Sequence, residues 1–316
     1  MSGAIAHIHL SLFPDEHALG VLGRLQLYSA YRSLKVTAGD ISDDLNGLNP
    51  AVVWRKLYAD IHRQWCPEVS LDNFAQRHTL TAYYHPFLPY AKQPLTRLDK
   101  LNAPQRSVIH HSMPWRYCAL CAEEDSEQYG VPYFHVSHQL PGVSICQRHH
   151  TPLLSGCLSC GLNWARLGKL LAPPLTPICS QCGNALHSLT LQPYIDDDMR
   201  WLQEMTLALR HGRYSSLSFE RLQRGYQQWL GMGPRSGVLS MKERAHVKEA
   251  QKVIDNYFDP RLYRALFTNA DMPNVANRRT TAISLYQAAF SNTFLSPVVH
   301  LLLIRAMYGD INHLPT

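Results

Sequence analysis

The chain of 316 residues is 46% apolar, which is enough for two or three domains with cores of their own. Its formal net charge of +6 is modest and by itself weak evidence for a nucleic-acid partner. No apolar run approaches the ~20 residues that a transmembrane helix needs, and the N-terminus shows no secretory leader. We therefore expect a cytoplasmic globular protein with no membrane partner.

Helical patterns fill the N-terminal part of the chain, residues 1–110. Pro14 is suited to the first position of a helix, and a row of leucines at helical spacing follows it: Leu19, Leu22 and Leu25. A break over residues 34–39 precedes a brief second helix, which is expected from Ile41 to Leu45.

Two more helices are expected before a proline-rich stretch. One runs from Ala51 to Trp65, and the next begins at Ser70 and carries Phe74. Short helices with tight connections predict a helix-turn-helix, although such bundles also serve as scaffolds or docking surfaces. Four prolines then predict a linker-like crossing into the central part: Pro86, Pro89, Pro94 and Pro104.

Seven of the eight cysteines fall in one stretch of the central part, residues 111–190. Together with one histidine they form four knuckles in a row, C-x-x-C, C-x-x-H, C-x-x-C and C-x-x-C. Two knuckles complete the shell of one tetrahedral ion. The simplest pairing predicts two structural zinc ions, one held by three cysteines and a histidine and one by four cysteines: Cys118, Cys121, Cys146 and His149, then Cys157, Cys160, Cys179 and Cys182.

Disulfide bonds, an iron–sulfur cluster and a catalytic zinc each fit these cysteines less well. Disulfides need an oxidising compartment, an iron–sulfur cluster prefers ligation by cysteine alone, and a catalytic zinc keeps one position open. His150 is an alternative ligand to His149, although the knuckle spacing favours His149. Cys66 lies apart, and we expect an ordinary buried thiol there. Seven thiolates and two zinc ions would lower the net charge to about +3.

Between the first two knuckles lies a histidine pair, His135 and His138. Taken alone, the pair resembles a further metal or catalytic site. Both predicted shells are already full, so packing against the knuckles is the better interpretation. The chain also has no glycine-rich phosphate loop and no nucleophile elbow, and its sequence carries no enzyme signature.

The C-terminal part, residues 191–316, is predicted to be helical. Asp196, Asp197 and Asp198 suit the positive N-terminal end of a helix, and this accounts for them more simply than a magnesium site does. Three further sequence signals mark helix boundaries: Ser218, the capping box Ser240–Glu243, and Ser296–Pro297 with Gly309 for the last helix.

This part is also basic. From Met199 onward, fifteen Lys or Arg residues stand against eight Asp or Glu residues. Two interpretations remain open. The charges either form solvated helix faces or provide a surface for a nucleic-acid backbone or an acidic partner.

The central block resembles the signature of the TniQ/TnsD family of transposon target-selection proteins. That family shows C-P-x-C, acidic residues, Y-G, an aromatic–His pair, H-Q-L-P-G-V, C-x-x-H, a Pro-Leu pair and C-x-x-C-G. Ala119 replaces the usual proline of the first knuckle. The matching positions are Cys118, Cys121, Tyr129, Gly130, His135, His138, Gln139, Leu140, Pro141, Gly142, Cys146, His149, Pro152, Leu153, Cys157, Cys160 and Gly161.

Three segments outside this block extend the resemblance. Residues Phe13–Glu16 are similar to the family's opening segment, where a proline and then a glutamate precede the first helix. His78–Phe87 and Ser296–Leu303 resemble segments of the TnsD branch.

The resemblance implies a bacterial adaptor at the nucleoid rather than a catalyst. Family members connect a chosen DNA target to a TnsC-like AAA+ ATPase, which recruits the transposase. Longer TnsD-type members read an attachment site through helix-turn-helix domains. Shorter TniQ-type members act with an RNA-guided CRISPR effector of the Cascade type, often as a homodimer. The short region after the leucine-rich block favours the CRISPR-coupled role, whereas the TnsD-like segments favour the direct reader.

Overall fold

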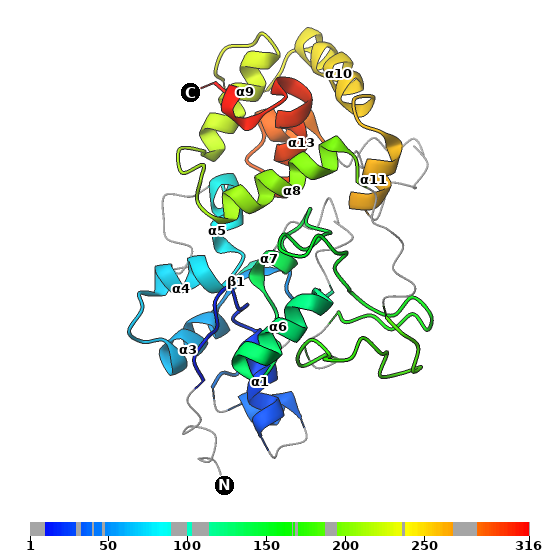
Figure 1. Cartoon of the computed structure of the whole chain (residues 1–316). Helices are drawn as coiled ribbons and strands as arrows, with labels where there is room; N and C mark the ends of the chain where they lie inside the picture. Colours follow the sequence, from blue (N-terminus) through cyan, green and yellow to red (C-terminus); the bar gives the residue numbers. More distant parts are fainter. Residues whose placement is uncertain are drawn as a thin grey trace. The chain divides into compact units, whose positions relative to one another are not determined.

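The computed structural model describes residues 10–29, 33–39, 41–45, 48–89, 100–102, 114–165, 167, 170–186, 195–235, 238–267 and 283–315. Helices dominate these residues, as Figure 1 shows, which confirms the mainly α fold class. The chain divides into two compact units. The first comprises Met1–Ala82, Pro94–Asn102 and His111–Pro193, and the second comprises Tyr83–Gln93, Ala103–His110 and Tyr194–Thr316.

The first unit combines short helices with a two-stranded antiparallel sheet, in which β1 (Val52–Arg55) pairs with β2 (Lys100–Asn102). The Ser70 hydroxyl caps α4 by accepting a hydrogen bond from the Asn73 amide, as its sequence predicts. The helices of this unit are α1 (Gly20–Tyr28), α2 (Leu34–Ala38), α3 (Lys56–Trp65), α4 (Leu71–His78), α6 (Ala119–Tyr129) and α7 (Val136–Gln139), and α5 (Thr81–Tyr84) follows α4.

The start predicted for the first helix was wrong. Pro14 and Asp15 form a turn, and α1 begins only at Gly20. Asp15 has a positive φ of 58°, a left-handed conformation that cannot continue into a right-handed helix. Glu16, whose carboxylate was expected in the first turn of the helix, instead stabilises the turn at Pro14 and Asp15. Its carboxylate accepts a hydrogen bond from the Phe13 amide.

Two further helix predictions were also wrong in position. The second helix occupies Leu34–Ala38, where the Ser33 hydroxyl accepts a hydrogen bond from the Val36 amide, and residues 41–45 are not helical. The third helix begins at Lys56 rather than Ala51. Residues Val52–Arg55 form β1, because its valines suit a strand and a pairing partner lies nearby in β2.

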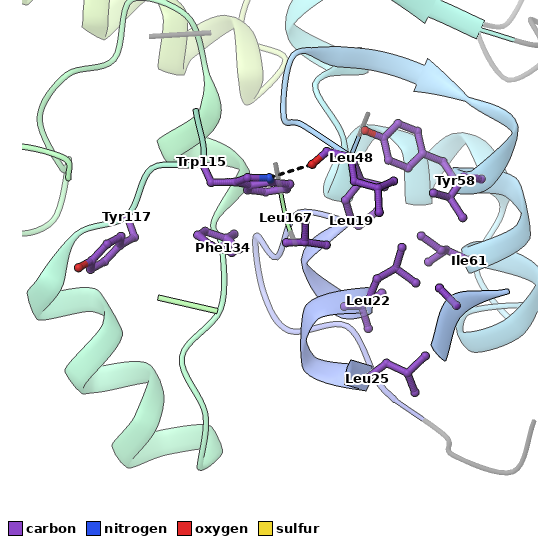
Figure 2. Close-up of a cluster of buried hydrophobic side chains, with 14 of the residues drawn as sticks. Leu19, Leu22, Leu25, Leu48, Tyr58, Ile61, Trp115, Tyr117, Phe134 and Leu167 are labelled. Carbon is purple, nitrogen blue, oxygen red and sulfur yellow. Dashed lines mark hydrogen bonds between the residues drawn. The ribbon is translucent and has the colours of Figure 1, made fainter. Parts of the chain in front are cut away.

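A buried apolar core holds the first unit together (Figure 2). Leu19, Leu22 and Leu25 of α1 share this core with residues that follow the predicted linker, including Trp115. The Trp115 indole donates a hydrogen bond to the Leu48 carbonyl at 3.1 Å. Residues on both sides of position 110 therefore contribute to one core. The division of the chain into domains 1–110, 111–190 and 191–316 stays a prediction.

The second unit is helical, and its helix starts agree with the predicted caps. Asp196 accepts a hydrogen bond from the Met199 amide, Ser218 caps α9, and Ser240 and Glu243 form a reciprocal capping box at α10. The helices are α8 (Asp197–Arg210), α9 (Phe219–Trp229), α10 (Met241–Asp255), α11 (Pro260–Leu266), α12 (Leu285–Phe290) and α13 (Pro297–Tyr308), with short 3₁₀ turns η1 (His85–Phe87) and η5 (Ile311–His313).

Helix α13 forms the centre of the second unit. Its residues from Pro297 to Ile304 are buried, and it packs against α8 (Figure 1). Arg305 of α13 donates to the Asp198 carboxylate of α8 at 2.7 Å. Each aspartate of the predicted helix start therefore has a structural role. Asp196 caps the helix, Asp197 forms an ion pair with Arg200, and Asp198 forms one with Arg305. Among the described residues, no helix is both long and apolar enough to cross a membrane.

Candidate metal centres

The structure brings the first four predicted ligands together. Sγ of Cys118, Cys121 and Cys146 and Nδ1 of His149 all lie within 4.8 Å of one another. The imidazole Nδ1 is 3.5 Å, 3.3 Å and 3.6 Å from the three sulfurs in that order. The three cysteines are buried, and Leu153 packs against them.

The second four predicted ligands form a cluster of their own. Sγ atoms of Cys157, Cys160, Cys179 and Cys182 lie within 4.8 Å of one another. Cys157 and Cys182 are 3.7 Å apart, and Cys160 and Cys179 are 3.6 Å apart. Hydrogen bonding from the Cys160 amide lowers the pKa of Cys157 to about 6. The thiolate is the form of cysteine that ligates a metal ion.

The distances fit metal shells and not disulfides. Sulfurs held at ~2.3 Å from a central tetrahedral ion lie roughly 3.8 Å from one another. The sulfur separations of 3.6 and 3.7 Å are close to that value. A disulfide would need about 2.05 Å. The two clusters could therefore bind two metal ions, one each.

Three of the four knuckles share one backbone design. The amides of Cys146, Cys157 and Cys179 each donate to a carbonyl five residues further on, at 2.8 Å. Each of the three cysteine carbonyls then accepts from the amide four residues on, at 2.9 Å. Isolated bridges flank each of these turns, namely Ile145–Pro152, Gly156–Asn163 and Ile178–Ala185. The remaining knuckle, which is the first along the chain, differs because Cys118 lies at the N-terminal end of α6.

This design decides between the two adjacent histidines. In the two C-x-x-C knuckles that share this design, the residue after the second cysteine is Gly161 or Gly183, with a φ of 71° or 72°. His150 stands at the equivalent position and has a φ of 53°. His150 therefore fills the left-handed position that closes the turn, while His149 turns its Nδ1 to the sulfurs.

The histidine pair lies beside the first cluster rather than forming another. His135 Nε2 is 2.8 Å from the Asp125 carboxylate. His138 Nε2 lies 3.9 Å from Sγ of Cys121, so its ring packs on a residue of the first cluster. Burial lowers the pKa of His138 well below its usual value and keeps the ring neutral. The predicted packing role is confirmed for His138.

The H-Q-L-P-G-V block forms a clamp on Arg116, two residues before the first knuckle. The Gln139 amide group donates to the Arg116 carbonyl at 2.8 Å and accepts from the Arg116 amide at 3.0 Å. The buried Arg116 guanidinium donates to the carbonyls of Leu140 and Val143. Burial lowers the pKa of Arg116 to about 9. The clamp fixes the chain just before Cys118.

Two residues of this site were missed from the sequence. Arg116 is the buried cation of the clamp, and Glu124 lies 2.9 Å from His149 Nε2. The hydrogen bond from His149 lowers the pKa of Glu124 below its usual value. The signal for Glu124 was its position three residues after Cys121, because residues so spaced share one face of a helix.

The fold and the clusters define a helical protein that could hold two metal ions in cysteine-rich knuckles. Residues 7–153 match the family model TniQ, so this part of the chain is similar to a TniQ domain. This domain supports a role in target selection for transposition. The matched span contains the first cluster and ends before Cys157. No curated protein matches the chain.

Proposed function

We propose that the chain is a non-catalytic adaptor for target selection in DNA transposition. It links an RNA-guided CRISPR effector of the Cascade type, together with its guide RNA, to a TnsC-like AAA+ ATPase and the transposase. The TniQ match over residues 7–153 is the observation that carries this proposal. The assembly of the family-like motifs around the first cluster supports it.

Both clusters are proposed to hold zinc in a structural role. Thiolate and imidazole are ligands that zinc prefers, and each cluster supplies four of them. Four protein ligands close a tetrahedral shell and leave no position for a substrate. When bound, zinc would supply cross-links between knuckles rather than chemistry on a substrate.

The proposed DNA contacts of the adaptor are directed at phosphates. Lys242 and Lys248 are exposed on α10, in the basic C-terminal region. Lysine contacts to phosphate carry no base information, which suits a protein whose target is chosen by guide pairing. Binding to naked DNA should then be weak, tolerant of sequence and steeply dependent on salt.

A direct reader of the TnsD type is the second candidate. Helices α3 and α4 contact each other across the connection of residues 66–70, as a helix-turn-helix requires. On α4, three exposed side chains are of types that pair with adenine or guanine: Asn73, Gln76 and Arg77. Base-edge contacts of this kind are each worth roughly 1–3 kcal/mol of discrimination.

Footprinting separates the two candidates. The isolated protein is tested on a candidate attachment site and on scrambled DNA over a range of salt concentrations. The adaptor predicts no sequence-specific protection, and K242A/K248A should weaken binding equally on both DNAs. N73A/R77A, a double variant on α4, is the matched control for K242A/K248A and should change DNA binding little. Strong site-specific protection that N73A/R77A abolishes would reject the adaptor and establish the direct reader.

Association with the effector is the complementary measurement. Tagged full-length protein is mixed with an effector that carries its guide RNA, and guide RNA retained with the tag is quantified. Retention is expected with the loaded effector, and the control is the same effector without guide RNA. If the tagged protein retains neither the loaded effector nor the effector without guide RNA, the result would contradict the CRISPR-coupled role.

A further inference from the structure

Glu124 connects helix α6 to the only histidine of the two clusters. Its Oε1 atom lies 2.9 Å from His149 Nε2, and the Nδ1 atom of the same ring faces the three sulfurs at 3.3 to 3.6 Å. The glutamate is one helical turn beyond Cys121, so the same helix supplies a ligand and the partner of another ligand. Arg148, the neighbour of His149, forms an ion pair with Glu124.

The two ring nitrogens of a histidine have different tasks at a metal. The ligating nitrogen must offer its lone pair, so the proton of the neutral ring must stay on the other nitrogen. A carboxylate that accepts from Nε2–H holds the proton there, orients the ring and makes Nδ1 a better donor. Glu124 has the position and the charge for this task, and Arg148 steadies the carboxylate.

We propose that Glu124 is a positioning residue of the first metal centre, which fixes the tautomer and orientation of His149 so that Nδ1 ligates the ion. This inference rests on the proposal that the cluster holds a metal. It predicts an asymmetry between the two centres, because the four residues of the second cluster are all cysteines and include no histidine ring for a carboxylate to orient.

The Glu124 side chain is 45% exposed, so its removal should affect retention of the ion more than folding. Loss of such a partner typically lowers metal affinity 10- to 100-fold. The second centre serves as an internal reference within the same molecule, since its four residues are cysteines and none of them is the histidine that Glu124 contacts.

The test measures zinc release from full-length protein to a chromogenic chelator. In E124Q and E124A we expect about half of the zinc to leave roughly 10- to 100-fold faster than in the unaltered protein, with the other half unchanged. E123A changes the adjacent exposed glutamate and should release zinc at the normal rate. Nitrogen-15 NMR of the histidine rings gives a second readout, in which the hydrogen-bonded Nε2–H signal of His149 is lost or shifted in E124A.

Two outcomes would overturn the inference in distinguishable ways. Release from E124Q and E124A at the normal rate, with an unchanged His149 signal, would show that Glu124 does not position the ring. Unaltered protein that is folded but holds no zinc would overturn the metal centre itself, and this inference with it.

Discussion

The Asp15 carboxylate accepts a hydrogen bond from the backbone amide of Ser137 at 3.1 Å, across 122 positions of sequence. The Asp15 carbonyl also accepts from the Val136 amide at 2.7 Å. The first amides of a helix have no hydrogen-bond acceptor within the helix. Asp15 provides acceptors for two such amides at the start of α7. These hydrogen bonds therefore join the opening segment of the TniQ domain to the segment that carries the histidine pair, beside the first cluster.

The buried ion pair behind this turn should be essential for stability. Arg24 donates to both Glu16 oxygens at 2.7 Å, and the two side chains are 3% and 0% exposed. Glu16→Gln leaves a buried guanidinium without its countercharge, and we expect a loss of about 3–5 kcal/mol in the free energy of unfolding. Urea denaturation of full-length protein measures this loss.

The matched control is an exposed ion pair. Arg200 and Asp197 lie in α8 with side chains 63% and 89% exposed. Asp197→Asn should lower stability by less than about 1 kcal/mol. Equal effects of Glu16→Gln and Asp197→Asn would show that burial of the first pair has no energetic consequence.

Two glycines of α1 should respond oppositely to the same substitution. A Cβ at Gly23 would lie 1.8 Å from the Leu171 carbonyl oxygen, whereas a Cβ at Gly20 would meet Phe134 at an ordinary 3.6 Å. Gly23→Ala should destabilise by about 1–3 kcal/mol or more, because a backbone segment must move. Gly20→Ala should be neutral or should stabilise by up to ~1 kcal/mol. Thermal denaturation of both variants measures these effects. Unchanged stability of Gly23→Ala would contradict the close approach of the Leu171 carbonyl to Gly23.

His300 should make the second unit less stable at acid pH. The ring is fully buried against Phe87 and Tyr226, and burial lowers its pKa from 6.5 to about 3. The Tyr226 hydroxyl lies 3.0 Å from Nδ1. Below pH 6.5 the unfolded chain binds a proton that the folded chain does not bind until about pH 3. Stability is therefore complete above pH 6.5 and falls as the pH drops towards 3.

Between pH 7 and pH 5 this histidine alone should lower the free energy of unfolding by about 2 kcal/mol. The measurement compares urea denaturation of the unaltered protein and of His300→Gln at both pH values. The comparison removes contributions that the two proteins share, such as protonation of metal ligands. An identical loss of stability in both proteins would contradict the buried neutral state of His300.

Local sequence signals predicted the features that depend on local geometry. The knuckle spacing identified the eight residues that gather in the two clusters, and the caps at Ser218 and Ser240 gave the starts of α9 and α10. Both kinds of signal work because the partners lie within a few residues of one another.

Features set by distant partners could not be predicted in this way. Pro14 and Asp15 suited a helix start, but the partners of Asp15 lie in α7. Val52 was assigned to a helix because its strand partner, Asn102, is distant in sequence and lies within the proline-rich stretch. Glu124 was visible only as one of several acidic residues until the fold placed it beside His149.

Metal analysis of freshly purified, folded protein is the most direct measurement of the proposed centres. Two zinc ions per chain are expected, and Cys118→Ser and Cys179→Ser should each retain about one, because each removes a ligand from a different cluster. Zinc in such knuckles contributes on the order of 10 kcal/mol to folding, so chelation should unfold the region around the clusters. Folded protein that contains no zinc, and is unaffected by a chelator, would contradict the proposed metal centres.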